Sequence, residues 1–515
     1  MDKKLNRRNF LKTGGVVVAG TMLAPSVLTG CFSGKQLANP LNYTVNDYLD
    51  HFGVSRRLIS EVLSEGLSRG GDYCDLYFQH TNSNSIGLED NIVNRAASTV
   101  SFGVGIRVLK GDQTGYSYTE DLTPEAMKSA ARTAANIANA SPFVRTRSFQ
   151  ERSFPNFYKI NTPWEDVSIS RKIPALEFIN QKVFSLDPRI RICNVSYSDS
   201  ASYILFANSE GVIATDYQPM CTIGSSVIAE QNGRREQNGY TISKRMDISM
   251  LNEDYLNRIS TKSVEDTILL FEATTPRAGR MPLVLAAGSS GILLHEAIGH
   301  GIEADFNRRG ESIFSDKIGK KVAEPFVTII DDGTIPQMRG SINIDDEGYP
   351  SQKTVLVENG TLVSYLHDRI SARHFNVAPT GSGRRESFRH MPLPRMRNTY
   401  MLNGPHDKQE IFESVKYGIL AETFTGGQVR IGPGDFTFFI KQGYLIENGK
   451  LTQPIKDVNI VGNGPKVLED IVMVGNDLAM SEAGWTCGKA GQGVPASMGQ
   501  PTVKVSSITV GGRNV

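Results

Sequence analysis

Cysteine is scarce in this sequence, and the cysteines that it contains lie far apart. Five occur among 515 residues, with no C-x-x-C pair, at Cys31, Cys74, Cys193, Cys221 and Cys487. Disulfide frameworks and zinc ribbons are built from closely spaced cysteines. The sequence therefore indicates neither of them.

An excess of charge of one sign is also absent. Lysine plus arginine total 55 and aspartate plus glutamate total 54, so the composition gives no sign of a nucleic-acid partner. With 39% hydrophobic and 21% charged residues, the chain is typical of a soluble globular protein. It is long enough for two or three domains.

The N-terminus lacks a convincing membrane span, because the apolar stretch that ends at Cys31 is short and rich in glycine. Arg7 and Arg8, followed by Asn-Phe-Leu-Lys, resemble a twin-arginine export signal, and Leu28 to Cys31 resemble a lipoprotein cleavage box. We therefore expect residues 1–30 to be a signal segment and Cys31 to be lipidated. The mature protein would then be an exported lipoprotein, anchored on the membrane and facing the periplasm. An uncleaved anchor helix is the alternative.

The remaining chain is predicted to have an α+β fold in three units. Residues 31–142 and 143–279 each combine helices with a β-meander, and residues 280–515 form a mostly antiparallel β domain that carries a helix with a metal motif. In the second unit, turn signals lie at residues 209–211 and 232–233.

The first unit contains clear local signals. Thr123 and Pro124 mark the start of a helix, as cap and first helical residue. Four short strands are predicted to form two hairpins, from residues 74–80 with 85–95 and 101–109 with 115–119.

The stretch HEAIGH, from His295 to His300, raises a question of spacing. Thermolysin-type zinc sites have H-E-x-x-H, with two histidines four residues apart on one helix face. Here they are five apart, so their side chains point roughly 140° away from each other on a regular helix. Either the motif is accidental and Glu296 and His300 are an ordinary helical pair, or the helix is irregular. Gly299 and Gly301 favour irregularity, because they allow a π-bulge or a helix end at this point.

Four motifs resemble a known family. They are LLHEAIGHGIEADFNRRG, IDDEGYP, TGSGRRESFRHMPLPRMRNTYML and CGKAGQGVPASMGQPTVKV, and they closely resemble the TldD/PmbA family of bacterial metallopeptidases. The resemblance is strongest over residues 280–515 and weaker over about 45–275. It implies that His295, His300 and Cys487 bind a divalent metal and that Glu296 is the catalytic acid/base. Familiar members with the metal motif are cytoplasmic, whereas this chain carries an export signal, so their substrates do not transfer directly.

The chemistry of these residues agrees with the resemblance. Two imidazoles and a thiolate leave one open position on a tetrahedral zinc, where water becomes acidic enough for Glu296 to take its proton. Iron is possible in place of zinc. Glu303 and Asp305 are competing third ligands, although we expect them to support the ligands rather than to bind the metal.

A loop rich in arginine is a candidate substrate-binding element. Arg384, Arg385, Arg389 and His390 could hold a substrate carboxylate or a developing oxyanion. Solvated surface is the ordinary role of such a cluster.

Three functions remain open. The favoured one is a metal-dependent peptidase acting on unstructured peptides, which would add as strands to an exposed sheet edge. It would work as a homodimer or as a heterodimer with a PmbA-like paralogue. The second is a non-catalytic partner subunit of such a complex. The third is a metal-binding redox or storage protein, for which further soft ligands are lacking.

Overall fold

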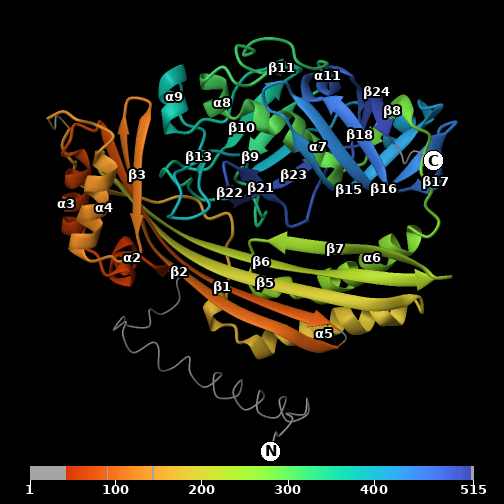
Figure 1. Ribbon diagram of the computed structural model, residues 1–515, viewed down its shortest axis with the longest axis horizontal. Helices are drawn as coiled ribbons and strands as arrows, with labels where there is room; N and C mark the ends of the chain where they lie inside the picture. The colour runs from red at the N-terminus through yellow and green to blue at the C-terminus, as the bar shows by residue number, and fades with distance from the viewer. Residues whose placement is uncertain (1–41, 90, 142–143, 512–515) are drawn as a thin grey trace, which may run out of the picture.

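The computed structural model describes residues 42–511, apart from residues 90 and 142–143. The expected signal segment and Cys31 lie outside the described residues. The molecule has two layers, a long curved sheet and a C-terminal domain that covers one face of it (Figure 1). Within the described ranges, no helix is both long and apolar enough to cross a membrane.

A single seven-stranded sheet joins the first two predicted units. It runs in the order β3-β2-β1-β5-β6, and both β4 and β7 pair with β6. Every pairing is antiparallel except that of β4 with β6. The strands are β1 (Tyr73–Glu89), β2 (Ile92–Lys110), β3 (Gln113–Thr119), β4 (Gln150–Arg152), β5 (Ile190–Asn208), β6 (Val212–Gln231) and β7 (Arg234–Lys244).

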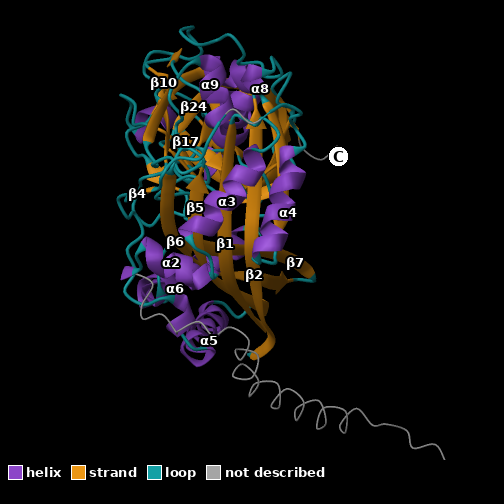
Figure 2. Cartoon of the chain, turned by 90° about the vertical axis from the view of Figure 1, so that its left-hand side faces the viewer, coloured by secondary structure: helices purple, strands orange, loops and turns teal. Residues whose placement is uncertain are grey.

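Helices cover the two ends of this sheet and create two separate cores. Figure 2 looks from the end where α3 and α4 lie against the strands, with α5 at the far end. The predicted start of α4 is confirmed, because the Thr123 side chain accepts a hydrogen bond from the Ala126 N–H and Pro124 follows it. The helices are α2 (Val45–Phe52), α3 (Arg56–Leu67) and α4 (Pro124–Ala135) at one end, and α5 (Ile169–Leu186) and α6 (Glu253–Leu269) at the other.

Of the two hairpins predicted in the first unit, one is confirmed and the other is wrong. Residues 101–109 and 115–119 pair as predicted, from Val104 opposite Thr119 to Lys110 opposite Gln113. Residues 74–80 and 85–95 do not form a separate hairpin. β1 and β2 are each continuous and pair with each other along almost their whole lengths. The polar segment 81–84 suggested a break, but Asn82 lies opposite Val100 on one side and Ala201 on the other. Backbone pairing on both sides outweighs the weak strand propensity of these polar residues.

The C-terminal domain contains two larger sheets, as expected mostly antiparallel. In one, the pairings of β8, β24, β18, β16 and β15 close into a ring. Each of the two sheets has one parallel pair, β8–β15 in the ring-forming sheet and β14–β23 in the other. The ring-forming sheet consists of β8 (Gly279–Leu285), β15 (Tyr417–Val429), β16 (Asp435–Glu447), β17 (Lys450–Ile455), β18 (Val458–Asn463), β19 (Ile471–Val474) and β24 (Val503–Gly511).

The second sheet and several short elements complete the domain. That sheet consists of β9 (Ile329–Asp332), β10 (Lys353–Glu358), β11 (Thr361–Leu362), β14 (Asn398–Met401), β20 (Ala479–Met480) and β23 (Ser497–Gln500). Two small ribbons are β12 (Gly383–Arg384) with β13 (Leu393–Pro394), and β21 (Thr486–Lys489) with β22 (Gln492–Pro495). The helices are α7 (Ile292–Leu294), α8 (Ala304–Arg308), α9 (Arg369–Phe375), α10 (Lys408–Glu413) and α11 (Gly464–Glu469).

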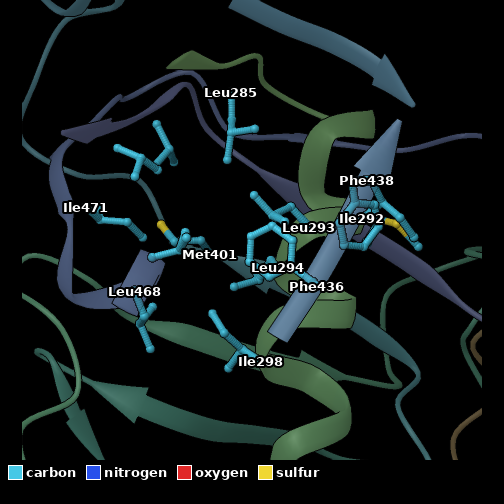
Figure 3. Packing of buried hydrophobic residues seen from close by; sticks show 14 of the residues in the cluster. Leu285, Ile292, Leu293, Leu294, Ile298, Met401, Phe436, Phe438, Leu468 and Ile471 are labelled. Carbon is cyan, nitrogen blue, oxygen red and sulfur yellow. The ribbon is translucent and has the colours of Figure 1, made fainter. Parts of the chain in front are cut away.

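The helix with the metal motif is held by the main core of this domain. Figure 3 shows Leu293 and Ile298 of this helix among Met401, Phe436 and Ile471, which come from three different strands. All five side chains are buried. Because interiors are packed closely, the helix has little freedom to shift.

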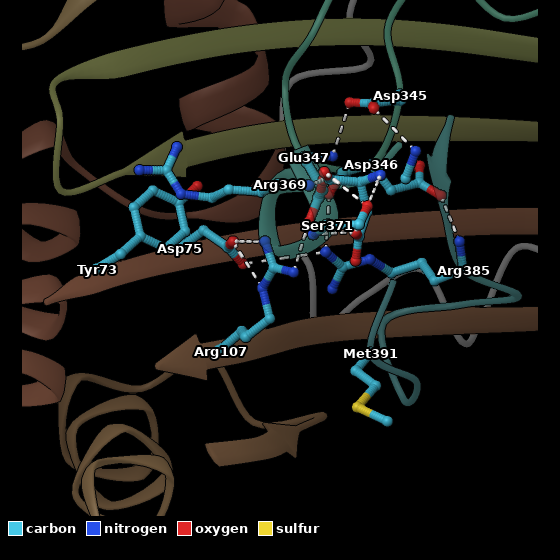
Figure 4. Close-up of polar contacts among 12 residues, drawn as sticks. Tyr73, Asp75, Arg107, Asp345, Asp346, Glu347, Arg369, Ser371, Arg385 and Met391 are labelled. Carbon is cyan, nitrogen blue, oxygen red and sulfur yellow. Dashed lines mark hydrogen bonds and ion pairs between the residues drawn. The ribbon is translucent and has the colours of Figure 1, made fainter. Parts of the chain in front are cut away.

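Buried ion pairs join the two layers. Arg107 of β2 donates to Asp75 of β1 at 2.9 Å and to Glu347 of the C-terminal domain at 2.6 Å, and all three side chains are buried. The other oxygen of Glu347 accepts the Arg369 N–H at 2.7 Å. Figure 4 shows this network. The IDDEGYP motif therefore fixes the C-terminal domain onto the sheet.

Candidate metal centre

The helix that carries HEAIGH is irregular, as predicted. Residues His295–Gly299 form a π-turn, and the His300 N–H donates to the His295 carbonyl oxygen. A short 3₁₀ turn, His300–Ile302, follows, and Glu303 is extended. The wide turn absorbs the additional residue between the histidines.

The two glycines of the motif serve close packing. Gly299 has ordinary right-handed helical dihedral angles, which any residue can adopt. A Cβ atom there would collide with the Met396 side chain, and one on Gly301 would come within 2.6 Å of the Phe314 ring. The glycines therefore let these side chains fit against the irregular helix, a reason different from the flexibility inferred from the sequence.

Cys487 approaches the helix from a tight hairpin. It lies on β21, and the turn to β22 is made by Ala490 and Gly491, both with positive φ. Arg395, fully buried, donates to the carbonyl oxygen of Cys487. The hairpin thus has a fixed position beside the π-turn.

The three predicted ligand side chains come together. The ligand atoms of His295, His300 and Cys487 all lie within 4.8 Å of one another, and all three residues are buried. The Cys487 Sγ is 3.5 Å from His300 Nε2, and the two imidazole rings are nearly perpendicular, at 84°. Residues 187 positions apart in the sequence therefore form one compact donor set.

Glu303 contacts the far side of His300. Its Oε2 atom is 3.0 Å from His300 Nδ1 and 3.0 Å from Lys489 Nζ, and Lys489 also donates to Asp305 at 2.6 Å. This leaves His300 Nε2 facing Cys487. The arrangement suits Glu303 and Asp305 for a supporting role, since a ligating histidine is commonly oriented by a carboxylate on its other nitrogen.

Charges within the cluster shift the pKa values of its members. Burial lowers the pKa of His300, but Glu303 and Cys487 together outweigh burial and raise that pKa well above its usual value. Burial raises the pKa of Glu303, whereas Lys489 and then His300 lower it, to about 2. Burial likewise raises the pKa of the Cys487 thiol, but His295 and His300 together hold it well below its usual value.

The donor set fits a divalent metal. Two imidazoles and a thiolate are typical ligands of zinc and of iron. His295 Nδ1 is buried and has no hydrogen-bond partner among the described residues, which is costly unless another group satisfies it. Negative charge on Cys487 beside the two imidazoles is also what a cation requires.

Glu296 lies at the open side of this cluster. Its side chain is 24% exposed, in contrast to the buried ligands, and its Oε2 atom is 3.8 Å from His300 Nε2. A carboxylate at this place can reach both the donor set and solvent.

Three residues of the arginine loop make their contacts outside the cluster. Arg385 is stacked on the Tyr77 ring at 4.4 Å and its amide donates to Asp346 at 2.7 Å. Arg389 donates to Glu120, and His390 contacts Ser387. These three residues serve the junction with the first sheet or their own loop, and the structure does not bring them to the His–Cys cluster.

Lys489 and Arg395 were missed by the sequence interpretation. Lys489 follows Cys487 by two residues on the same strand, so both side chains lie on one face of it. That spacing was a usable signal. Arg395 had no local signal, because its contact with Cys487 joins residues 92 positions apart.

Known families match most of the chain. The PmbA/TldA metallopeptidase C-terminal domain matches residues 278–512, its central domain 162–271 and its domain 1 residues 74–138. The chain belongs to the PmbA/TldD metallopeptidase family. A twin-arginine translocation signal sequence matches residues 4–24, which indicates export across the membrane.

Curated relatives of the family carry the name metalloprotease. The metalloprotease TldD homologue of Buchnera aphidicola (subspecies Acyrthosiphon pisum) is 40% identical over 458 residues, which cover 88% of this chain and 95% of that protein. The Haemophilus influenzae metalloprotease TldD homologue is 37% identical, covering 92% and 100%. These names support a metallopeptidase-type function.

A solved structure shares the fold. TldE from Thermococcus kodakarensis superimposes with a TM-score of 0.69 at 17% identity, covering 88% of this chain and 100% of that chain. The α+β prediction is confirmed by this likeness and by the elements described above.

Proposed function

We propose that this protein is an exported metal-dependent peptidase. His295, His300 and Cys487 hold a divalent metal, zinc or iron, and Glu296 is the general base. The observation that carries the proposal is the convergence of the three donor atoms within 4.8 Å beside a partly exposed carboxylate.

The residues of this chain divide the work of hydrolysis. A divalent metal at such a site lowers the pKa of water and polarises a carbonyl group. Glu296 accepts the proton of the attacking water at a carboxylate oxygen and returns it to the departing amine. Glu303 and Lys489 fix the orientation of His300, and the apolar core below the helix excludes bulk water.

Unstructured peptides are the proposed substrates. Beyond β3, which pairs with β2 only from Val104 onwards, residues 92–103 of β2 have no second strand partner among the described residues. An extended peptide can add to such an edge through backbone hydrogen bonds.

A paralogous subunit is the proposed partner. The fold shared with TldE supports a heterodimer of this chain with a PmbA-like paralogue, and a homodimer is the alternative. The convergence of three metal donors and Glu296 in this chain favours the catalytic role over that of a non-catalytic subunit. It also favours catalysis over metal storage, since the structure gathers no larger set of soft ligands in the described residues.

The test combines metal analysis with a peptidase assay. Protein purified from the membrane fraction should contain about one equivalent of metal and cleave an unfolded protein such as reduced casein. A chelator should abolish cleavage, and zinc or iron should restore it. Metal-loaded protein that leaves unfolded substrates intact, alone and with its paralogue, would contradict the proposal.

The proposed location is the periplasmic face of a membrane, with a lipid on Cys31. Replacement of Arg7 and Arg8 by lysine should retain the protein inside the cell, since the export machinery recognises the arginine pair. Cell fractionation and mass spectrometry of the N-terminus measure this. Unprocessed wild-type protein in the cytoplasm would contradict it.

A further inference from the structure

A polar cavity lies between the first sheet and the C-terminal domain. Its volume is about 500 Å³. Part of its wall is formed by small polar side chains from the middle of β1 and β5, among them Ser83, Asn84, Ser198 and Ser200. Ser83 and Asn84 belong to the polar segment 81–84 that suggested a strand break, and Ser198 and Ser200 lie on β5. Their polarity therefore serves the cavity.

Four arginines line the same cavity. One of them, Arg385, is stacked on Tyr77 and lies 3.9 Å from Asp75, and the other three come from different elements. Arg245 follows β7, Arg339 lies in a loop of the C-terminal domain, and Arg384 is on β12. Arg245 and Arg384 are each 3% exposed, and Arg339 is half-buried. The side chain of Arg245 is hydrogen-bonded to the backbone of Arg339, since Arg245 Nε donates to the Arg339 carbonyl oxygen at 3.2 Å.

None of the three has a carboxylate within 4 Å among the described residues. Their hydrogen bonds go to neutral acceptors. Arg339 donates to the Trp485 carbonyl oxygen at 2.8 Å and to Ser243 Oγ at 2.7 Å, and Arg384 donates to the Met396 carbonyl oxygen at 2.7 Å. A guanidinium group has five N–H donors, so much of the hydrogen-bonding capacity of Arg384 is unused.

The acidic residues that line the cavity are engaged elsewhere. Asp199 is paired with Lys172. Asp346 accepts the Arg385 N–H at 2.7 Å, and Glu386 accepts the Gly493 N–H at 2.6 Å. With Asp199 paired, only Asp346 and Glu386 remain among the lining carboxylates, against four lining arginines, so positive charge in the cavity is in excess.

The electrostatics of the arginines agree with this excess. Burial and the charge of Arg245 lower the pKa of Arg339 to about 10. Burial and Arg245 also lower the pKa of Arg384, to about 9, although Asp346 acts in the opposite direction. Three cations that repel one another in a shared cavity are costly unless an anion joins them.

The cavity adjoins the His–Cys centre. Arg339 Nη2 is 3.3 Å from Thr486 Oγ1, next to Cys487 in the chain. Arg384 holds the carbonyl of Met396, whose side chain packs against Gly299 of the π-turn. Pro495, on the hairpin partner of the Cys487 strand, is part of the cavity wall.

We propose that Arg245, Arg339 and Arg384 form an anion-binding subsite that holds a carboxylate of the peptide substrate beside the metal centre. The carboxylate is the C-terminus of the peptide or an acidic side chain. Arginine suits this role because its planar group binds carboxylates in a bidentate manner. This assignment rests on the proposed peptidase function and adds a preference among its substrates.

The test measures binding of three acetylated ten-residue peptides made of glycine, serine and alanine. One has a free C-terminus, one a C-terminal amide, and one an amide with a single internal glutamate. Isothermal titration calorimetry uses the metal-loaded mature protein with Glu296→Gln, which slows cleavage. At least one carboxylate peptide should bind roughly 10-fold to 100-fold more tightly than the plain amide, as for other hydrogen bonds to charged groups. The peptide that binds more tightly than the plain amide identifies the source of the carboxylate, either the C-terminus or the glutamate side chain.

Variants assign that preference to the arginines. Arg339→Gln should reduce it by at least about fivefold, as expected for the loss of a charge-assisted contact, and leave binding of the amide unchanged. Arg384→Lys should retain part of it, since the charge remains. Arg280→Gln is the matched control, because Arg280 is an exposed arginine whose side chain contacts Ser507.

The results separate this inference from the proposed function. If the amide binds the unsubstituted cavity as tightly as both carboxylate peptides, the subsite is overturned, even when the wild-type enzyme cleaves casein. Equal weakening of all three peptides by Arg339→Gln also overturns it. A carboxylate preference in a protein that cleaves nothing would instead uphold the subsite and contradict the peptidase function.

Discussion

The His–Cys centre and the arginine-lined cavity treat buried charge in opposite ways. In the centre, each charged group has a partner of opposite sign, as Glu303 has in Lys489 and Lys489 in Asp305. In the cavity, Arg245, Arg339 and Arg384 are close to one another and to neutral acceptors. A compensated framework can hold its ligands rigidly, whereas an uncompensated one is ready for a charge from outside. The contrast separates residues that build a site from residues that await a ligand.

The largest expected effect concerns Glu296, which lies at the open side of the centre. Glu296→Gln should keep the metal and lower turnover by about 10²–10⁴-fold, the usual contribution of a general base. Steady-state kinetics on casein together with metal analysis measure both properties. Glu311→Gln, at an exposed glutamate paired with Arg309, is the control. Near-normal turnover of a metal-loaded Glu296→Gln protein would remove Glu296 from the mechanism.

The next effect tests the ligand set. Cys487→Ala should weaken metal binding by more than about 100-fold, because loss of a group that merely orients a ligand already costs 10–100-fold. Competition with a chromogenic chelator gives the affinity. Cys221→Ala is the control, a buried cysteine in the core of the first layer. Unchanged affinity in Cys487→Ala would make Glu303 or Asp305 the better candidate for the third ligand.

A smaller effect is expected at Glu303, which pairs with Lys489 and contacts His300 on the side of its ring away from Cys487. Glu303→Gln should weaken metal binding by about 10–100-fold, since His300 loses the carboxylate that orients it. The same chelator competition measures this loss. A decrease as large as that of Cys487→Ala would indicate that Glu303 binds the metal directly, and no decrease would remove its role in orienting His300.

Local features of the first sheet and of the His–Cys centre could be predicted from the sequence. The N-terminal cap of α4, the turns after β5 and β6, and the irregularity of the HEAIGH helix follow from short-range rules, and the structure bears them out. The family resemblance supplied Cys487, which no local pattern connects to the histidines. The continuity of β1 could not be predicted, because pairing with both β2 and β5 overrides its polar middle segment.

The arginine cavity was out of reach for a related reason. Arg245, Arg339 and Arg384 come from a strand end, a loop and a short ribbon, and only folding brings them together. The motif TGSGRRE drew attention to Arg384 and Arg385 as a pair, yet the structure gives them separate roles. Both line the cavity, but Arg385 is engaged with Asp346 and Tyr77, whereas Arg384 donates to the neutral carbonyl oxygen of Met396.

The smallest expected effect separates compensated from uncompensated arginines directly. Arg384→Gln should raise the free energy of unfolding by about 0.5–2 kcal/mol, the range for stabilising changes at sites kept for function. The cause is the removal of a buried charge that has no carboxylate partner and is repelled by Arg245. Arg107→Gln is the opposing case, since it leaves Asp75 and Glu347 buried without their partner, and should lower stability by about 3–5 kcal/mol. Urea denaturation of the metal-free proteins measures both changes. If Arg384→Gln is destabilised as strongly as Arg107→Gln, Arg384 is a structural residue with a partner in the fold, and the contrast between centre and cavity fails at this position.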